Sequence, residues 1–384
     1  MFDGLLKTVR GWFSEPEPEP ADDWLYVSPS PYRTAEALVD QEDRTAYFYL
    51  VTLKAPDQRW RQCWVRNLDR APLDYEAEGT ETPLMPFEHC RHPNGAEPLS
   101  ADRLSALWLP AGDGVALFED DELIAFIPPW SGEDDFWGYA RDCKGQSALA
   151  WDLAPARGEI DQRLAEARAF WNAWSSRPIW QQSQPQFIDS AESVLGPHSR
   201  YFAIDGGEWP PKALLVFEEL DDWKILVTIG VSLCPQPRVA ADSVDPSIPR
   251  RIELALAVPA HLAEDLLDQC IRGISGLAEL PWAYGSFLGH LHTVPMSCFP
   301  AAKDGSALPA AILTNRHEML PMIEFPEIFG EPVQLLWVIP ITAAERQLAI
   351  QSGSEELLSF LDHAPPVRFS ASSPRSLVRN ENEL

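Results

Sequence analysis

Two apolar segments of strand length constrain the fold of this chain more than any other feature. They are residues 252–258 (IELALAV) and 333–339 (VQLLWVI). Segments this apolar have almost no polar face to turn toward solvent, so they predict strands buried inside a sheet. A helix is predicted after the first segment, over residues 261–274. Pro340 is predicted to end the second strand, and residues 342–345 (TAAE) have the T-x-x-E pattern of a capping box that starts a further helix.

Shorter runs rich in β-branched and aromatic residues predict three β-hairpins, because each pair of runs flanks a short polar turn. The pairs are residues 46–53 with 61–68, 115–118 with 123–127, and 213–217 with 224–231. Residues 83–98 contain Pro, His and Gly and are predicted to be mostly loop. The chain as a whole is therefore predicted to be α+β, with strand and helix alternating in its second half.

The length of 384 residues favours more than one domain. Residues 24–155 are predicted to form an N-terminal α+β domain. Residues 156–180 are predicted to be a connecting helix with an apolar stripe at helical spacing, made of Ile160, Leu164, Ala167, Trp171 and Trp174. A second domain is predicted over residues 187–363, where Gly353 ends one helix and Ser354 caps a short last one. Residues 364–384 are polar and are predicted to be a disordered tail.

The first 23 residues combine two patterns. Residues 1–13 predict a short amphipathic helix, whose apolar side chains are Phe2, Leu5, Leu6, Val9, Trp12 and Phe13. Residues 14–23 (SEPEPEPADD) alternate Glu and Pro, which predicts an extended linker. The helix is expected either to pack on its own chain or to dock on a partner or membrane surface. The segment lacks the apolar core and cleavage site of a signal peptide.

Charge limits the classes of partner. The chain has 30 Lys and Arg against 58 Asp and Glu, a formal net charge of −28. Residues 1–155 contain 13 basic and 29 acidic residues (net −16), and residues 156–384 contain 17 basic and 29 acidic residues (net −12). Such a surface repels nucleic-acid phosphates and anionic lipids and attracts basic proteins. No window is apolar enough for a membrane span. The six cysteines are sparse, which favours a reducing, cytoplasmic location over a secreted disulfide framework.

The spacings that most catalytic and nucleotide-binding motifs require are missing from the sequence. His89 and His92 flank Cys90 in a loop, and a metal-dependent or hydrolytic enzyme built on them is kept as an alternative. Cys143 lies beside Arg141 and Lys144, whose charges would lower the pKa of a thiol. The preferred interpretation is a protein that is not an enzyme and needs no metal or cofactor.

The stretch over residues 187–363 resembles the suppressor-of-fused family. The resemblance rests on five ordered blocks: residues 226–232 (LVTIGVS), 251–256 (RIELAL), 280–293 (LPWAYGSFLGHLHT), 338–345 (VIPITAAE) and 353–358 (GSEELL). In the third block, Leu291 and His292 are inserted before Thr293. Residues 24–155 resemble the N-terminal extension of long bacterial members of the family, through residues 84–86, 107–114, 127–132 and 138–142.

This resemblance implies a protein-binding function and a mixed or antiparallel sheet with packed helices. Animal members hold a zinc-finger transcription factor by adding a peptide strand to their sheets, and bacterial members have been proposed as immunity proteins against secreted toxins. A basic toxin or effector would suit the acidic charge. Another possibility is an adaptor that docks through its N-terminal helix.

The candidate partner contacts fall in two places. Trp282, His290 and His292 are expected on a loop after a core helix, where aromatic and polar side chains often serve recognition, although Trp282 could instead belong to the core. The other candidates lie in residues 1–13: Phe2, Leu5, Leu6, Val9 and Trp12.

Overall fold

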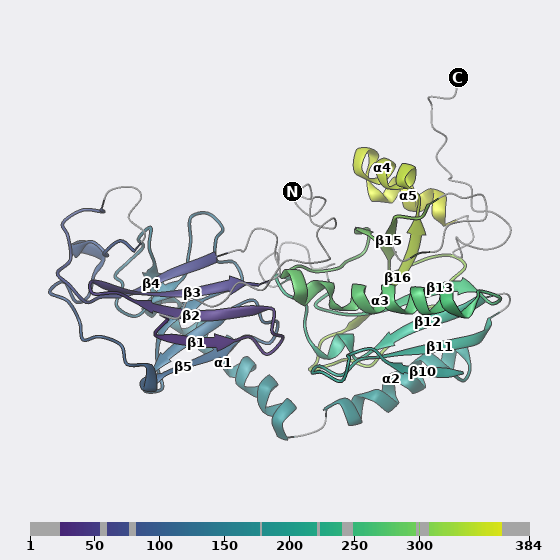
Figure 1. Cartoon of the computed structure of the whole chain (residues 1–384), viewed down its shortest axis with the longest axis horizontal. Helices are drawn as coiled ribbons and strands as arrows, with labels where there is room; N and C mark the ends of the chain where they lie inside the picture. Colours follow the sequence, from purple (N-terminus) through teal and green to yellow (C-terminus); the bar gives the residue numbers. More distant parts are fainter. Residues whose placement is uncertain are drawn as a thin grey trace.

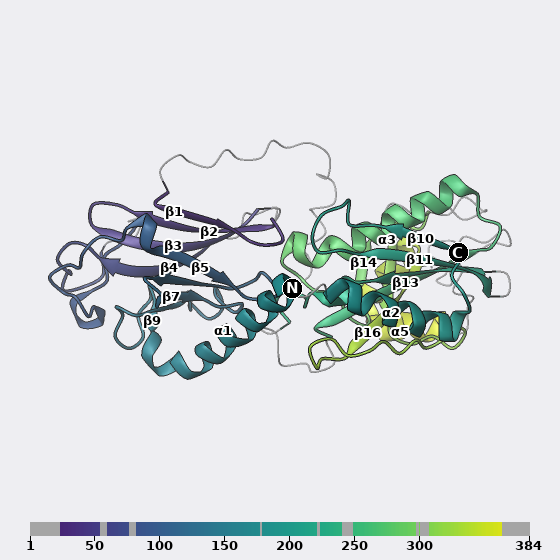
Figure 2. The ribbon, with the colours of Figure 1, turned by 90° about the horizontal axis from the view of Figure 1, so that it is seen from below.

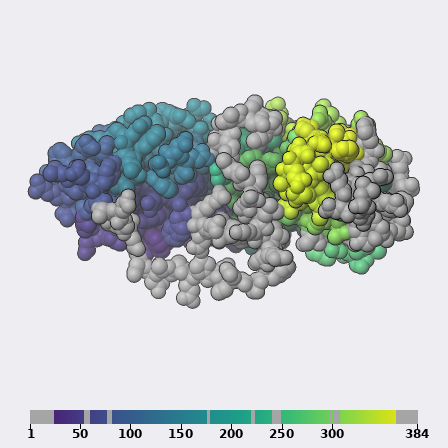
Figure 3. All heavy atoms as spheres, turned by 90° about the horizontal axis from the view of Figure 1, so that it is seen from above, coloured from purple at the N-terminus to yellow at the C-terminus, as the bar shows by residue number. Residues whose placement is uncertain are grey.

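The computed structural model describes residues 24–53, 60–76, 82–176, 179–220, 223–239, 249–296, 299 and 307–362. The predicted N-terminal helix, the Glu-Pro linker and the polar tail lie outside these ranges. The described chain forms two parts that lie side by side along the long axis of the molecule (Figures 1 and 3). We call the part before helix α1 the N-terminal half and the part after helix α2 the C-terminal half.

The N-terminal half contains two β-sheets. The first has the order β1-β2-β3-β4 and the second β5-β6-β7-β8-β9, and all neighbours are antiparallel except β8 and β9. The strands are β1 (Tyr26–Pro29), β2 (Ala35–Gln41), β3 (Thr45–Thr52), β4 (Trp60–Asn67), β5 (Leu104–Trp108), β6 (Val115–Glu119), β7 (Glu122–Ile127), β8 (Tyr139–Ala140) and β9 (Trp151–Asp152). Two single 3-10 turns, η2 (Phe87–His89) and η3 (Ala101–Arg103), interrupt the long loop between the sheets.

The two sheets pack face to face around one apolar core to which strands of both contribute. The predicted hairpins β3–β4 and β6–β7 are confirmed by their antiparallel registers. In the β6–β7 turn, Asp120 and Asp121 both have positive φ angles (47° and 66°). Asp tolerates this left-handed conformation, which tight hairpin turns require.

Helices α1 (Leu153–Ser176) and α2 (Ile179–Leu195) lead from the first half to the second. Ile160, Leu164 and Ala167 are buried against strands β6 and β7, so α1 forms a third layer beneath the two sheets (Figure 2). Trp171 and Trp174 at the other end of the stripe also contact the core of the C-terminal half. The stripe found in the sequence therefore spans the junction between the halves.

The C-terminal half is built on a seven-stranded sheet of order β10-β11-β12-β13-β16-β15-β14, with β13 and β16 parallel and the other neighbours antiparallel. The elements are β10 (Arg200–Ala203), β11 (Ala213–Leu220), β12 (Trp223–Ile229), η4 (Val231–Leu233), β13 (Arg251–Pro259), α3 (Glu264–Tyr284), β14 (Thr293–Pro295), β15 (Ala310–Thr314), β16 (Val333–Ile341), α4 (Ala343–Ser352) and α5 (Ser354–Leu361).

Both faces of this sheet are covered. Helix α3 packs on one face, and α2 with α5 packs on the other (Figure 2). Every residue of β13 is buried, and so are the last seven of β16. The two apolar segments are therefore adjacent central strands, as their composition predicts, and the fold class is α+β. No helix in the described ranges is long and apolar enough to cross a membrane.

The structure corrects three local predictions. Helix α3 does not end near residue 274 but continues to Tyr284, because its apolar stripe goes on through Leu277 and Ala278 and its stop is Gly285, in the left-handed conformation with φ 55°. Strand β16 does not end at Pro340. Its pairing with β13 ends at Trp337, so Pro340 has a neighbouring strand on one side only, where sheets tolerate proline.

The third correction concerns the last helix. Ser354 is its first residue and not its cap, since the N-cap position is Gly353 and makes no side-chain bond. The capping box of α4 is confirmed, because Thr342 Oγ1 accepts from the Glu345 N–H and the Glu345 carboxylate accepts from the Thr342 N–H.

Candidate functional site

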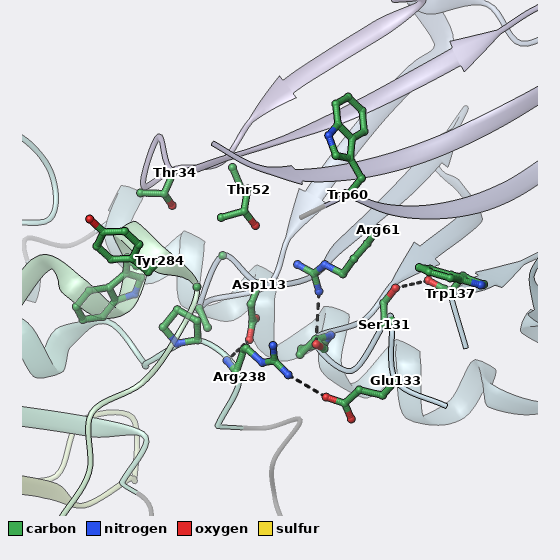
Figure 4. Close-up of a pocket in the computed structure, with 18 residues that line it drawn as sticks. Thr34, Thr52, Trp60, Arg61, Asp113, Ser131, Glu133, Trp137, Arg238 and Tyr284 are labelled. Carbon is green, nitrogen blue, oxygen red and sulfur yellow. Dashed lines mark hydrogen bonds and ion pairs between the residues drawn. The ribbon is translucent and has the colours of Figure 1, made fainter. Parts of the chain in front are cut away.

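A cavity of about 440 Å³ lies between the two halves (Figure 4). Residues of both halves line it, and most of them stand at strand ends or in the loops that follow. From the N-terminal half these are chiefly Thr34, Thr52, Trp60, Arg61, Asp113, Ser131, Glu133 and Trp137, and from the C-terminal half Pro237, Arg238, Trp282, Tyr284 and Gly285. The cavity is therefore a product of how the halves meet.

Arg238 makes the polar contacts that join the halves at the cavity. Its backbone N–H donates to Asp113 Oδ2 at 2.6 Å, and its guanidinium donates to Glu133 at 3.0 Å. Burial raises the pKa of Asp113, which is only 6% exposed, while the Arg238 N–H and the charges of Arg61 and Arg250 partly offset that rise. The cavity thus brings two carboxylates and two guanidinium groups together.

An aromatic cluster holds the halves together beside the cavity. The ring of Tyr32, from the β1–β2 turn, lies 6.4 Å from that of Trp171, 5.1 Å from Trp209 and 5.9 Å from Trp282. The Tyr32 hydroxyl donates to the carbonyl of Pro110. Aromatic groups from the N-terminal half, α1 and the C-terminal half therefore form one buried contact.

Trp282 lines the cavity, but it is not on a loop. It lies in the last turn of α3, is 5% exposed, and donates from Nε1 to the carbonyl of Pro235 at 3.2 Å. Its indole stacks on Tyr32 at an interplanar angle of 26°. Trp282 is thus a core residue that also forms part of the cavity wall. The sequence left open whether it belongs to the core or to a binding surface, and its position combines both features.

His290 and His292 follow α3 in the loop before β14, and neither belongs to the described residues that line the cavity. Nδ1 of His290 accepts from the Asn315 N–H at 3.4 Å, and Nδ1 of His292 accepts from the Gly289 N–H at 3.2 Å. Burial lowers the pKa of both imidazoles. The structure therefore does not bring these two residues to the site that contains Trp282. Phe2, Leu5, Leu6, Val9 and Trp12 lie outside the described residues.

His89 and His92 contact different neighbours. Nδ1 of His89 lies 3.1 Å from the carbonyl of Lys144, whereas Nε2 of His92 lies 3.6 Å from the carboxylate of Asp142. Within the described ranges, no group of three or more His, Cys, Asp or Glu side chains is placed to hold a metal ion.

The pKa of Cys143 is raised and not lowered, because burial outweighs the nearby positive charge. The thiol is buried and donates to the carbonyl of Ala150 at 3.2 Å. Burial raises its pKa to about 12, and Asp152 adds to this effect while Arg91 opposes it. Cys143 is therefore a buried structural thiol rather than an activated nucleophile.

Two of the sequence blocks meet around a single buried carboxylate. Glu253 on β13 accepts hydrogen bonds from the N–H groups of Gly230 and Ser232, at 2.9 and 3.0 Å, and from the Ser232 hydroxyl at 2.6 Å. Thr228 Oγ1 lies 2.7 Å from its other oxygen. Burial raises the pKa of Glu253 to about 7. These residues fix the turn after β12, so their role in the structure is architectural.

Most cavity residues carry no distinctive sequence signal. Trp60, Arg61 and Arg238 belong to none of the sequence blocks, and only their tertiary positions bring them together. Asp113, Ser131 and Tyr284 are partial exceptions, since they lie in the blocks at residues 107–114, 127–132 and 280–293. Those blocks could have marked them as candidates.

Residues 208–370 match the sequence model of the family described as suppressor of fused protein (SUFU). The chain contains a suppressor-of-fused-like domain. The match includes Glu253 with its turn, Arg238 and Trp282. It covers less than half of the chain, and the N-terminal half lies outside it.

Eighteen solved chains are similar in structure to this protein. A chain of the Sufu–Fu complex crystal structure matches with 12% identity and a TM-score of 0.32, over 47% of this chain and 83% of that one. Drosophila Suppressor of Fused matches with 11% identity and a TM-score of 0.29, over 47% of each chain, so this protein spans about half of its length. Comparison with curated protein sequences gives no match.

Proposed function

We propose that this protein is a non-enzymatic, cytoplasmic binding module that sequesters a basic protein partner, and that a segment of the partner enters the cavity between the halves. The observation that carries the proposal is the shared lining of this cavity. Because both halves contribute side chains, one bound segment would contact both at once.

The chemistry of the cavity wall suits a peptide. Trp60 is 46% exposed and stands at the start of β4, and Trp137 and Tyr284 add two further aromatic side chains to the lining. Exposed aromatic residues around a cavity are typical anchors of protein interfaces. Asp113 already accepts a hydrogen bond from the Arg238 backbone N–H, and Glu133 is ion-paired with the Arg238 guanidinium, so a partner would meet polar groups that are already partnered around these anchors.

The net charge determines which partners would associate fastest. A charge of −28 shared by both parts of the sequence attracts basic proteins over a distance set by ionic strength. A basic toxin or effector is therefore the proposed partner, in line with the immunity role suggested for bacterial proteins that the sequence resembles. Association should be fast at low salt and slow markedly as salt is added.

The test uses a basic protein encoded beside this one in its genome, produced in an inactive form. Binding to the full-length protein is measured by calorimetry at 50 and 500 mM salt. We expect a stoichiometric complex that Trp60→Ala weakens at least tenfold, as for an aromatic hot spot. Leu73→Ala is the matched control, since Leu73 is 83% exposed and does not line the cavity.

Equal weakening by the two substitutions would contradict the placement of the partner in the cavity. Absence of any complex with basic neighbours at low salt, together with failure to protect cells that express the active neighbour, would overturn the proposed function itself.

A further inference from the structure

A second cavity of about 440 Å³ opens where three segments of the N-terminal half and α1 meet. These segments are the loop after η2, the loop after β8 and the first two turns of α1. The lining residues are Arg91, His92, Arg141, Asp142, Leu153, Ala154 and Arg157. Three arginines thus line one cavity in a chain where acidic residues outnumber basic ones by 58 to 30.

Arg91 is held in place by its own hydrogen bonds. Its Nε donates to the carbonyls of Arg141 and Cys143, at 2.9 and 3.0 Å, and its Nη2 donates to Asp152 at 2.7 Å. Its Nη1 has no partner among the residues that the structure describes. The guanidinium plane is therefore fixed while both N–H donors of Nη1 stay available.

Arg157 also keeps donors available. Its Nε lies 2.8 and 2.9 Å from the two oxygens of Asp161, one turn further along α1. Neither of its Nη atoms has a partner within the described part of the chain. The helix end itself contributes little, because the Ala154 N–H already donates to Asp152 and residue 155 is a proline without an N–H. The donors for a ligand are thus guanidinium groups.

The carboxylate that lines this cavity already has arginine partners from its own chain. Asp142 is the one carboxylate among the described lining residues, and it accepts from Arg141 Nε at 3.0 Å and lies 3.4 Å from Arg66 Nε. Arg141 also donates to Glu122 at 2.8 Å. Arg141 is therefore occupied by carboxylates of its own chain, and Arg91 and Arg157 supply the donors for an incoming anion.

We infer that this cavity binds the phosphate group of a phosphorylated small molecule. Among the described residues, the free Nη1 of Arg91 and the two free Nη atoms of Arg157 together match the several oxygens and double charge of a phosphate, whereas a carboxylate is satisfied by one guanidinium fork. The cavity exceeds a bare phosphate ion and falls within the size range of sites for organic ligands. The inference goes beyond the proposed function, since none of the described lining residues of this cavity lines the one between the halves.

Calorimetric titration of the full-length protein with inorganic phosphate and with glucose 6-phosphate tests the inference. We expect saturable binding, weakened about tenfold or more by Arg157→Ala, because a hydrogen bond to a charged group is lost. Asp161→Asn should tighten binding, because it removes the carboxylate that competes for Arg157. Arg163→Ala is the control: it breaks the equivalent pair with Glu159 on the same helix, outside the cavity.

Tighter binding of glucose 6-phosphate than of inorganic phosphate would support an organic phosphate as the ligand. Equal affinities for the two probes would instead assign inorganic phosphate as the ligand. Absence of saturable binding of both probes would overturn the inference. So would wild-type affinity in the Arg157→Ala variant, whose fold is checked by circular dichroism.

Discussion

The backbone N–H of Arg238 donates a 2.6 Å hydrogen bond to the buried Oδ2 of Asp113, 125 residues earlier in the chain. Arg238 adopts a φ of 61° where it makes this bond. A residue with a side chain is strained there by about 1 kcal/mol. The strained residue thus lies at the junction of the halves, beside the cavity proposed to bind a partner.

Substitutions at these two residues should have opposite effects on stability. Asp113→Ala leaves the Arg238 N–H without its acceptor, and we expect it to lower the free energy of unfolding by about 1–3 kcal/mol. Arg238→Gly keeps the N–H and relieves the strain, so it should preserve or raise stability. Urea unfolding measures both, with the exposed Asp74→Ala as control. A stable Asp113→Ala variant would show that the contact does not hold the halves together.

Gly112 and Tyr32 should be energetically coupled. Gly112 has φ 74°, and a Cβ at this position would lie 2.7 Å from the Tyr32 ring. We expect Gly112→Ala to cost about 1–3 kcal/mol from overpacking, in addition to about 1 kcal/mol of backbone strain. In a Tyr32→Ala background only the strain should remain. A double-mutant cycle without coupling energy would contradict this close contact.

Glu253 should make the stability of the fold depend on pH. Burial raises its pKa from the ordinary 4.5 to about 7, so the folded protein retains a proton that the unfolded chain has released. The stabilising contribution is therefore complete below about pH 4.5 and is lost as the pH rises through 7, by up to about 3 kcal/mol.

Glu253→Gln tests this dependence, because an amide mimics the protonated acid and does not titrate. The difference in unfolding free energy between wild type and this variant should change between pH 5 and 8, with the wild type losing stability relative to the variant. A constant difference over that range would contradict the raised pKa.

The described thiols should be unreactive in the folded protein. Cys63, Cys90, Cys143, Cys234 and Cys270 are all buried, and burial raises the pKa of Cys143 to about 12 and that of Cys234 to about 11. At pH 8 we expect iodoacetamide to label these five only after denaturation, as followed by mass spectrometry. Rapid labelling of native Cys143 would instead restore the idea of an activated thiol.

Local patterns predicted much of the fold correctly, for reasons that lie within a few residues. Two hairpins of the N-terminal half, the helix with Ile160 and Leu164, and the capping box at Thr342 each depend on neighbouring side chains and turn residues. Predictions of where an element ends were less accurate, although Gly353 does end α4 as predicted. Pro340 did not end its strand, because the neighbouring strand β13 had already diverged, and α3 continued until a glycine adopted the left-handed conformation.

The candidate site was far less accessible to sequence reasoning. Trp282 lines the cavity, whereas His290 and His292, the two candidates that follow it in the sequence, lie in a loop that does not line it. Strands β6 to β12 and helices α1 and α2 lie between Asp113 and Arg238 in the sequence, and no periodicity connects the two residues. The arginines at residues 91, 141 and 157 likewise come from separate segments that only folding brings to one cavity.

The sequence by itself determined several hairpins and helices of this protein, its acidic charge and the central strands β13 and β16, since these follow from local propensity, apolar periodicity and summed charge. The tertiary structure alone decided where function can reside. Tyr32, Trp171 and Trp282 meet because two halves pack against each other, and a cavity exists only between surfaces that long-range packing has placed together.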